Sequence, residues 1–180
     1  MKKVLLTLVL VLMTAGFAGA FDTTALQLSV WAPKTQLVPP EIAVSGLKLN
    51  LPFGSNYNVT GLDLGLVSIN NAQGDELNAK VSALQVNLWN STNGEFTGLQ
   101  VGLVNIADTS NGIEIGGLCN VVHGTSRGIT VGLVNTSLEY HGVQIGLINY
   151  TEFLTGVQIG LVNIATKSTL PFFPIINMCF

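Results

Sequence analysis

Charge is the scarcest property of this sequence. Only 9% of its 180 residues are Asp, Glu, Lys or Arg, against roughly 25% in ordinary soluble domains. The 7 basic residues form no cluster, and the formal net charge is −3. Because nucleic-acid binding requires clustered Lys and Arg, we expect no nucleic-acid partner.

Residues that carry catalytic or metal chemistry are equally sparse. The chain has 2 histidines, His123 and His141, and 2 cysteines, Cys119 and Cys179. A zinc site needs three or four ligands at defined spacing, and no serine has the setting of a nucleophile. We therefore expect no catalytic, cofactor-binding or metal-binding residue and no enzyme activity. The cysteines could pair in an exported protein, but their spacing does not distinguish a disulfide from two small apolar residues.

Long apolar runs are confined to the N-terminus. No later stretch has the ~18 uninterrupted apolar residues of a transmembrane helix. Lys2 and Lys3 precede an apolar run at residues 4–17 and small residues at 18–20, which is the pattern of a cleavable export signal. We expect cleavage of residues 1–20, so that the mature chain begins at Phe21. Cleavage leaves 5 of the 7 basic residues against 10 acidic ones, a net charge of −5.

Glycine is abundant, at 20 of 180 residues, and much of it belongs to one repeated phrase. The phrase reads Gly–apolar–polar–apolar–Gly–Leu–apolar–Asn, and a stretched copy occupies residues 112–120. The closing asparagines from Asn90 to Asn177 follow one another at steps of 15, 15, 15, 14, 14 and 14. Such a period predicts a fold built from stacked units. Its invariant positions in the four regular copies are Gly98, Gly102, Asn105, Gly128, Gly132, Asn135, Gly142, Gly146, Asn149, Gly156, Gly160 and Asn163.

Each phrase alternates like a β-strand. Leu99, Val101 and Leu103 share one face, because successive strand side chains point to opposite sides. The other face is thinned by glycine and carries Gln100. A glycine inside a strand costs roughly 0.5–1 kcal/mol against alanine, so two in each phrase indicate close packing above that face. Residues between phrases, such as 108–111 and 123–127, are expected to form turns.

We expect an all-β fold, and favour an antiparallel up-and-down β-barrel or meander of about ten strands. The Leu/Val/Ile face would meet lipid, and the Gly/Gln face would line a narrow interior. The chain closes on an alternating segment with Phe172, Ile176 and Phe180, similar to the last strand of bacterial outer-membrane barrels. The aromatic residues near unit ends, where interfacial girdles lie, are Trp31, Trp89, Phe96, Tyr140, Tyr150 and Phe153.

The alternative is a parallel β-solenoid with coils of 14–15 residues. Equal spacing favours it, since membrane barrels usually alternate short turns with long loops. The Leu/Val/Ile face would then fill the core, and the asparagines would form a stacked ladder.

The phrases GVQIGLIN and GVQIGLVN and the ending PFFPIINMCF resemble a bacterial family of exported surface-repeat proteins, of which the leptospiral surface-repeat proteins are members. The resemblance covers residues 61–180, after an N-terminal part at 21–60 with two strands and a proline-rich loop. It implies an exported, envelope-associated β protein, and supplies no activity or functional residue. The copy at 112–120 departs from the pattern, because Gly116 and Gly117 add a residue and predict a β-bulge.

Two acidic residues, Asp63 and Glu114, stand at the polar position where other phrases carry Gln or Thr. They could form a paired acidic site, although such residues are more often solvated or bonded to a neighbouring Gln.

We expect a non-enzymatic protein embedded in the bacterial outer membrane, with a structural or surface-interaction role. Its partners would be outer-membrane lipid and the barrel-assembly machinery. The alternative is a surface-displayed, periplasmic or secreted β-solenoid that binds an unknown surface ligand.

Overall fold

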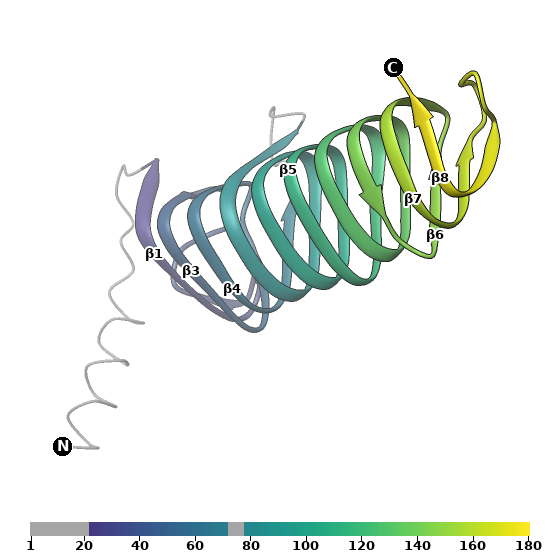
Figure 1. Cartoon of the computed structure of the whole chain (residues 1–180). Helices are drawn as coiled ribbons and strands as arrows, with labels where there is room; N and C mark the ends of the chain where they lie inside the picture. Colours follow the sequence, from purple (N-terminus) through teal and green to yellow (C-terminus); the bar gives the residue numbers. More distant parts are fainter. Residues whose placement is uncertain (1–21, 72–77) are drawn as a thin grey trace.

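The computed structural model describes residues 22–71 and 78–180, and these residues contain no helix. Figure 1 shows the chain wound into successive coils that stack along one axis, from β1 to β8. The all-β class is therefore confirmed, and no described helix could cross a membrane. The export signal at 1–20 lies outside the described residues. The strands are β1 (Thr23–Trp31), β2 (Thr35–Gln36), β3 (Ala43–Ser55), β4 (Asn58–Asn71), β5 (Ala79–Ile145), β6 (Ile148–Thr151), β7 (Phe153–Ala165) and β8 (Phe172–Cys179).

Neighbouring coils pair in parallel through equivalent residues of the phrase. Gly46 pairs with Gly61, 15 positions on, and Gly142 pairs with Gly156, 14 positions on. Parallel neighbours need a connection of about a dozen residues, which the rest of each coil supplies. Among the residues that the structure describes, antiparallel pairing occurs only between β1 and β2 and between β7 and β8. The expectation of antiparallel neighbours throughout is therefore wrong.

The residues between phrases are strand rather than turn. β5 continues through 67 residues and includes both 108–111 and 123–127, so the turns expected there are wrong. The chain changes direction within the strand at the first glycine of the phrase. Gly128 and Gly142 have φ of +122° and +136°, values that L-residues with a Cβ rarely adopt. A corner can therefore form without ending the strand.

The stretched copy carries its extra residue without breaking the stack. Gly112 lies over Gly98, 14 positions earlier, whereas Asn120 bonds Asn105, 15 positions earlier. The additional residue is taken up between Gly112 and Asn120, as the expected bulge requires.

The phrase turns its glycine-thinned face inward. Gln100 and Asn105 are fully buried, while Leu103 is 46% exposed. The next phrases repeat this arrangement, so the expectation that Leu, Val and Ile fill the core of a coil is wrong. The parallel coils enclose an interior lined by Gly and Gln, which was the interior expected for the antiparallel barrel.

An apolar core lies in the opposite half of the coils, on the inner side of the segments between phrases. One cluster joins Val44, Val59, Val81, Ala83, Phe96 and Ala107, and a second joins Tyr140, Leu154 and Ala165. Phe96 and Tyr140 are thus buried in the interior, and their expected place in an interfacial girdle is wrong. Both continue a line of inward residues that other coils fill with Val, Leu or Ser. Trp31, Trp89, Tyr150 and Phe153 are exposed.

Both ends of the stack reverse the strand direction. β2 pairs antiparallel with β1 through Gln36 and Thr35. At the other end β8 runs antiparallel along β7 from Phe172 to Cys179, so the expected terminal strand is present. Its large side chains, including Ile176 at 44%, are exposed. The stack therefore ends in an apolar strand with β7 on one side.

Candidate functional site

Six closing asparagines form a continuous chain of side-chain hydrogen bonds, here called the asparagine ladder. The Nδ2 of each of the first five donates to the Oδ1 of the asparagine on the following coil at 2.8 or 2.9 Å. Asn135 Nδ2 also donates to the Ile145 carbonyl at 2.9 Å. Stacked amides of this kind satisfy one another, so their burial carries little desolvation penalty. The members are Asn90, Asn105, Asn120, Asn135, Asn149 and Asn163.

The second glycine of the phrase makes room for the asparagine ladder. A Cβ on Gly146 would lie 2.5 Å from the Gly132 carbonyl oxygen and 2.7 Å from Asn135 Nδ2. Both distances are far below van der Waals contact. The Gly and Asn positions of the regular phrases are therefore coupled, because a side chain at the second glycine would overlap the ladder.

The third position of the phrase builds a second buried line, here called the polar column. Gln100 Nε2 donates to Gln85 Oε1, and Gln158 Nε2 donates to Gln144 Oε1, both at 2.8 Å. In both pairs the later coil donates to the earlier one. Strand register and stacking place its members in the order Gln27, Lys48, Asp63, Gln85, Gln100, Glu114, Thr130, Gln144 and Gln158.

Lys48 and Asp63 form a buried ion pair on adjacent coils. Lys48 Nζ lies 3.6 Å from Asp63 Oδ2, and both side chains are 0% exposed. The ammonium also donates to Ser68 Oγ at 3.0 Å and to Asn70 Oδ1 at 2.7 Å. Burial lowers the pKa of Lys48, and the Asp63 carboxylate opposes that shift. Side chains of Asn50, Ser68, Gln85 and Asn87 donate to Asp63.

Glu114 is the remaining buried charge-bearing residue of the polar column. It is 1% exposed, and Thr130 Oγ1 donates to its Oε2 at 3.4 Å. Burial raises the pKa of Glu114 to about 7, and the hydroxyls of Ser110, Thr130 and Ser126 oppose that rise. No Lys, Arg or His lies buried beside it within the described residues.

The structure keeps Asp63 and Glu114 apart. Asp63 pairs with Gln85, and Gln85 bonds Gln100, so two coils separate the carboxyl groups. A paired acidic site is therefore wrong. The other hypothesis, that such a residue is solvated or bonded to a neighbouring Gln, describes Asp63, which accepts from Gln85 Nε2 at 2.8 Å.

The outer surface of the phrases is a broad apolar surface, here called the apolar face. One line of it carries Leu103, Leu118, Leu133, Leu147 and Leu161, with exposures of 46, 52, 46, 49 and 67%. Flanking lines carry Ile113 and Ile129, and Ile115, Ile145 and Ile159, each about two-fifths exposed. Lys48, Asp63 and Glu114, the charged residues of the phrases, all point inward. No outward charge therefore interrupts the apolar face in the described phrases.

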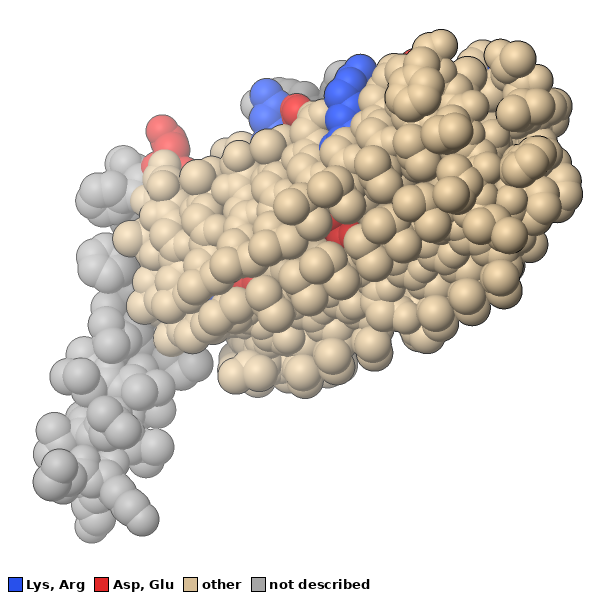
Figure 2. All heavy atoms as spheres, in the orientation of Figure 1, with Lys and Arg blue, Asp and Glu red and all other residues tan. Residues whose placement is uncertain are grey.

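Exposed charges gather on the polar flank, defined as the outer surface of the segments between phrases. Figure 2 shows basic and acidic atoms along one edge, beside a broad side almost free of them. His123 Nδ1 lies 3.3 Å from Asp108 Oδ1, and His141 Nε2 lies 3.2 Å from Glu139 Oε1. A hydrogen bond from Thr125, together with His141, lowers the pKa of Glu139. Both histidines thus belong to strand β5.

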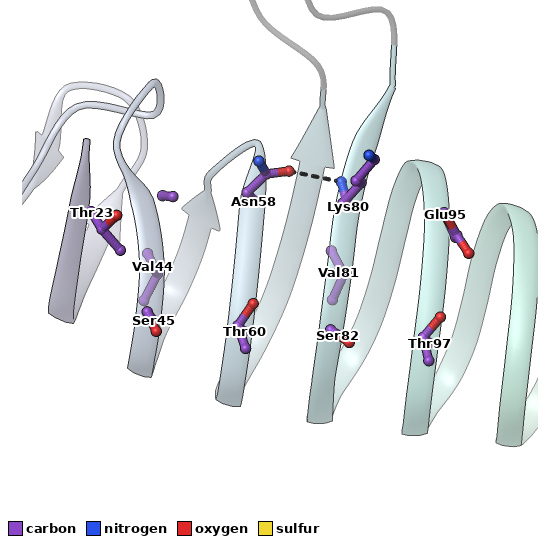
Figure 3. A pocket seen from close by; sticks show the side chains of 11 residues that line it. Thr23, Val44, Ser45, Asn58, Thr60, Lys80, Val81, Ser82, Glu95 and Thr97 are labelled. Carbon is purple, nitrogen blue, oxygen red and sulfur yellow. Dashed lines mark hydrogen bonds between the residues drawn. The ribbon is translucent and has the colours of Figure 1, made fainter.

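A polar trough with a volume of about 550 Å³ lies across β1, β3, β4 and the start of β5 (Figure 3). Ser45, Thr60, Ser82 and Thr97 stand in one line along it, one on each coil. The Lys80 backbone N–H donates to Asn58 Oδ1 at 3.0 Å beside this line, and Glu95 adds a carboxylate. The trough offers hydroxyls and one charge of each sign to a polar ligand.

Metal-ligating side chains stay apart. Within residues 22–71 and 78–180, no three or more His, Cys, Asp or Glu side chains lie close enough to hold a metal ion. Cys119 and Cys179 are free thiols, and the Cys179 Sγ lies 4.0 Å from the Thr169 hydroxyl.

A comparison of the chain with protein-family models, curated proteins and solved structures finds no match. Among the apolar face, the polar flank and the buried polar lines, the apolar face is the surface that water solvates least favourably.

Proposed function

We propose that this chain is an exported, non-enzymatic β-solenoid of the bacterial cell envelope that attaches to lipid membrane through its apolar face. The observation that carries the proposal is the line of half-exposed leucines flanked by isoleucines, with every charged phrase residue turned inward. Soluble monomers rarely expose an apolar patch above a few hundred Å². A long, uncharged apolar surface of this kind fits against the hydrocarbon region of a membrane.

The leucine line alone supplies a useful attachment energy. Full burial of one leucine contributes roughly 1.5–3 kcal/mol, so five leucines that are about half exposed contribute roughly 4–7 kcal/mol on entering lipid. A single myristoyl chain, with a binding constant of about 10⁴ M⁻¹, contributes a similar amount. The flanking isoleucine lines extend the same surface, and stable attachment requires more than one such contribution.

Electrostatics favours apolar over charge-driven attachment. The mature chain would carry 5 basic and 10 acidic residues, so anionic lipid would repel it overall. Attachment should therefore persist on neutral lipid and depend little on salt, because apolar burial is not screened by ions. The resemblance to exported surface-repeat proteins implies the same location.

Co-sedimentation with neutral phosphatidylcholine vesicles at low and high salt tests this proposal. The wild-type chain should sediment with vesicles at both salt concentrations. The double variant Leu133→Glu/Leu147→Glu should bind at least about tenfold more weakly, since each glutamate carries a charge into lipid.

Leu138→Glu provides the matched control. Leu138 is 45% exposed but lies on the polar flank, where the Glu152 backbone N–H donates to its carbonyl. This variant should bind vesicles within about twofold of wild type, because its side chain lies away from the proposed lipid contact. The proposal would be overturned if the wild-type chain, in the absence of detergent, stayed in the supernatant at every lipid concentration.

The polar trough favours a second candidate, a surface-displayed solenoid that binds a neutral polyhydroxyl ligand. Its regular line of Ser and Thr hydroxyls can both donate and accept hydrogen bonds. Oligosaccharide binding to the wild-type chain, abolished by Thr60→Val/Thr97→Val and retained by Leu133→Glu/Leu147→Glu, would support this candidate. Equal binding by both variants would sink it.

A further inference from the structure

Two buried oxygen atoms on adjacent coils of the polar column have no hydrogen-bond partner. They are Gln100 Oε1 and Glu114 Oε1, and both residues are at most 1% exposed. Leaving a buried acceptor unpaired is unfavourable. The neighbouring steps of the column do not share this defect, since Gln100 donates to Gln85 and Gln158 donates to Gln144.

The direction of the column explains the defect. Gln85, Gln100 and Gln158 each donate an amide hydrogen to the earlier coil, so Gln100 Oε1 would accept from the next position, which is Glu114. A carboxylate has no proton to donate, whereas a carboxylic acid has one O–H donor. A proton on Glu114 would therefore give Gln100 Oε1 the bond that a glutamine supplies elsewhere.

The surroundings of Glu114 contrast with those of Asp63. Asp63 has the Lys48 ammonium and donors from four side chains, so it is stable as an anion. Glu114 has only hydroxyls near it, and the Tyr140 hydroxyl bonds Gly128 O, Thr130 Oγ1 and Val143 O instead. An isolated buried carboxylate neutralises rather than stay charged.

No other ionised group faces Glu114 from the coils packed against it. Tyr140 is the other titratable group inside, and burial raises its pKa to about 12, so it is uncharged at neutral pH. The remaining titratable groups of these coils in the described chain are not buried, and are Glu95, Asp108, Cys119, His123, Arg127, Glu139 and His141.

We propose that Glu114 is built into the folded interior as the neutral acid and donates its proton to Gln100 Oε1, so that the central coils contain a proton-binding joint. The raised pKa of Glu114, about 7 because of burial, agrees with this geometry. The proposal does not depend on lipid attachment, and either can fail without the other.

The joint makes stability depend on pH in a defined window. In the unfolded chain the Glu114 pKa returns to about 4.5, so between about 4.5 and about 7 the folded state holds a proton that the unfolded state releases. Stability then falls as pH rises through this window, because the folded state binds more protons. Above about 7 neither state holds the proton, and the decline stops.

The variant Glu114→Gln supplies the donor permanently and is the residue that the column uses on other coils. Its unfolding midpoint should equal that of wild type near pH 4, exceed it increasingly up to about pH 7, and stay a constant amount higher above that. Glu95→Gln, which neutralises an exposed carboxyl on the preceding coil, should follow the wild-type curve throughout.

A titration of wild-type protein labelled with ¹³C at glutamate side-chain carboxyls provides a readout that needs no variant, with Glu114→Gln used only to assign the signal. The Glu114 signal should titrate with a midpoint near 7. A Glu114 midpoint below 5 would overturn the proposal. So would a stability difference between Glu114→Gln and wild type that is the same at every pH. A wild-type unfolding midpoint at pH 8 that rises with potassium or sodium ions, but not with tetramethylammonium, would instead assign the neutralising charge to a metal cation.

Discussion

At the scale of single residues, the first glycine of a phrase is fixed by backbone conformation. Gly142 has φ of +136°, and a Cβ there would lie 2.0 Å from the Gly128 carbonyl oxygen. Gly142→Ala should therefore lower the free energy of unfolding by about 3–5 kcal/mol, from strain plus overlap. Gly117→Ala should cost less than about 1 kcal/mol, because the nearest atom is Leu103 Cδ2 at 3.0 Å, on a side chain that can move. Urea denaturation compares the two, and equal losses would contradict the corner geometry.

The asparagine ladder gives a second test at this scale. Asn135→Ala removes one rung and leaves an Asn120 donor and an Asn149 acceptor short of a partner. The expected loss is about 2–4 kcal/mol, since each buried orphan costs roughly 1–3 kcal/mol. Asn111→Ala is the control, because Asn111 bonds Glu95 at the surface and should change stability by less than about 0.5 kcal/mol. Thermal unfolding that ranks these variants in the opposite order would show that the ladder contributes little.

The ion pair inside the polar column predicts a pH-dependent variant. Asp63→Asn leaves the Lys48 ammonium buried without a counter-charge, which should cost about 3–5 kcal/mol at pH 7. Because burial lowers the folded-state pKa of Lys48 below 10.5, the unfolded state holds the extra proton, and the variant should regain stability relative to wild type as pH rises toward 10. Asp108→Asn, at an exposed carboxyl, is the control. Denaturant titrations at pH 7 and pH 9.5 that give the same difference for Asp63→Asn would contradict this account.

The residue pattern predicts the two faces of the phrase correctly, but not which of them is buried. Leu103 and Gln100 lie on opposite faces in either case, and the usual preference of leucine for the interior points the wrong way here. The deciding interaction is between copies, because Asn and Gln side chains stacked in register satisfy one another. Lys48 was missed as a site residue. Its place at the third position of the phrase, two residues after Gly46, would have put it beside Asp63 once the parallel register was known.

At the scale of elements, β8 closes one end of the stack. The Asn163 Nδ2 donates to the Phe173 carbonyl, and Asn177 Nδ2 donates to Gln158 Oε1. Removing residues 170–180 should therefore leave β7 without its partner strand β8. A resulting loss of about 2 kcal/mol in the free energy of unfolding should lower the unfolding midpoint by several degrees. Deleting Phe180 alone should be nearly silent, since its side chain is 93% exposed and lies beyond the strand. A large loss from the single deletion, seen by calorimetry, would assign Phe180 a role in the fold.

Strand boundaries depend on pairing with neighbouring coils, which a single sequence does not reveal. Residues 108–111 were expected to be a turn because Asp, Thr, Ser and Asn favour turns. In the stack these residues are strand, since neighbouring coils supply their backbone partners. A polar segment reads as a turn in isolation and becomes a strand only when a parallel neighbour lies 14 or 15 positions away.

At the scale of the whole molecule, each coil touches mainly the coils before and after it, so stability should be graded along the axis. Backbone amides in the central phrases of β5 should exchange with solvent most slowly. Those of β2, a strand of 2 residues at one end, should exchange at least about a hundredfold faster. Hydrogen exchange followed by mass spectrometry checks this gradient. Uniform protection from end to end would instead indicate that the stack opens only as one unit.

The all-β class and the 14–15-residue period could be read from the sequence, but the direction of neighbouring strands could not. Alternation with a period of two is the same in parallel and antiparallel sheets. The export signature and the terminal aromatic residue favoured an antiparallel membrane sheet. Equal spacing favoured parallel coils, and pairing between equivalent phrase residues is the observation that decides between them.

The asparagine ladder also determines where along each coil the chain tolerates extra residues. From the closing position to the first residue of the next phrase the chain takes 8 steps from Asn90 to Gly98 and 7 steps from Asn105 to Gly112. From Ser68, in the same closing position, to Ala83 it takes 15 steps. The difference between 7 and 8 steps falls on the polar flank, while the ladder keeps its rungs. The molecule is therefore a natural display scaffold, in which a foreign peptide inserted between a closing asparagine and the next glycine should leave the stack, and the opposite apolar face, unchanged.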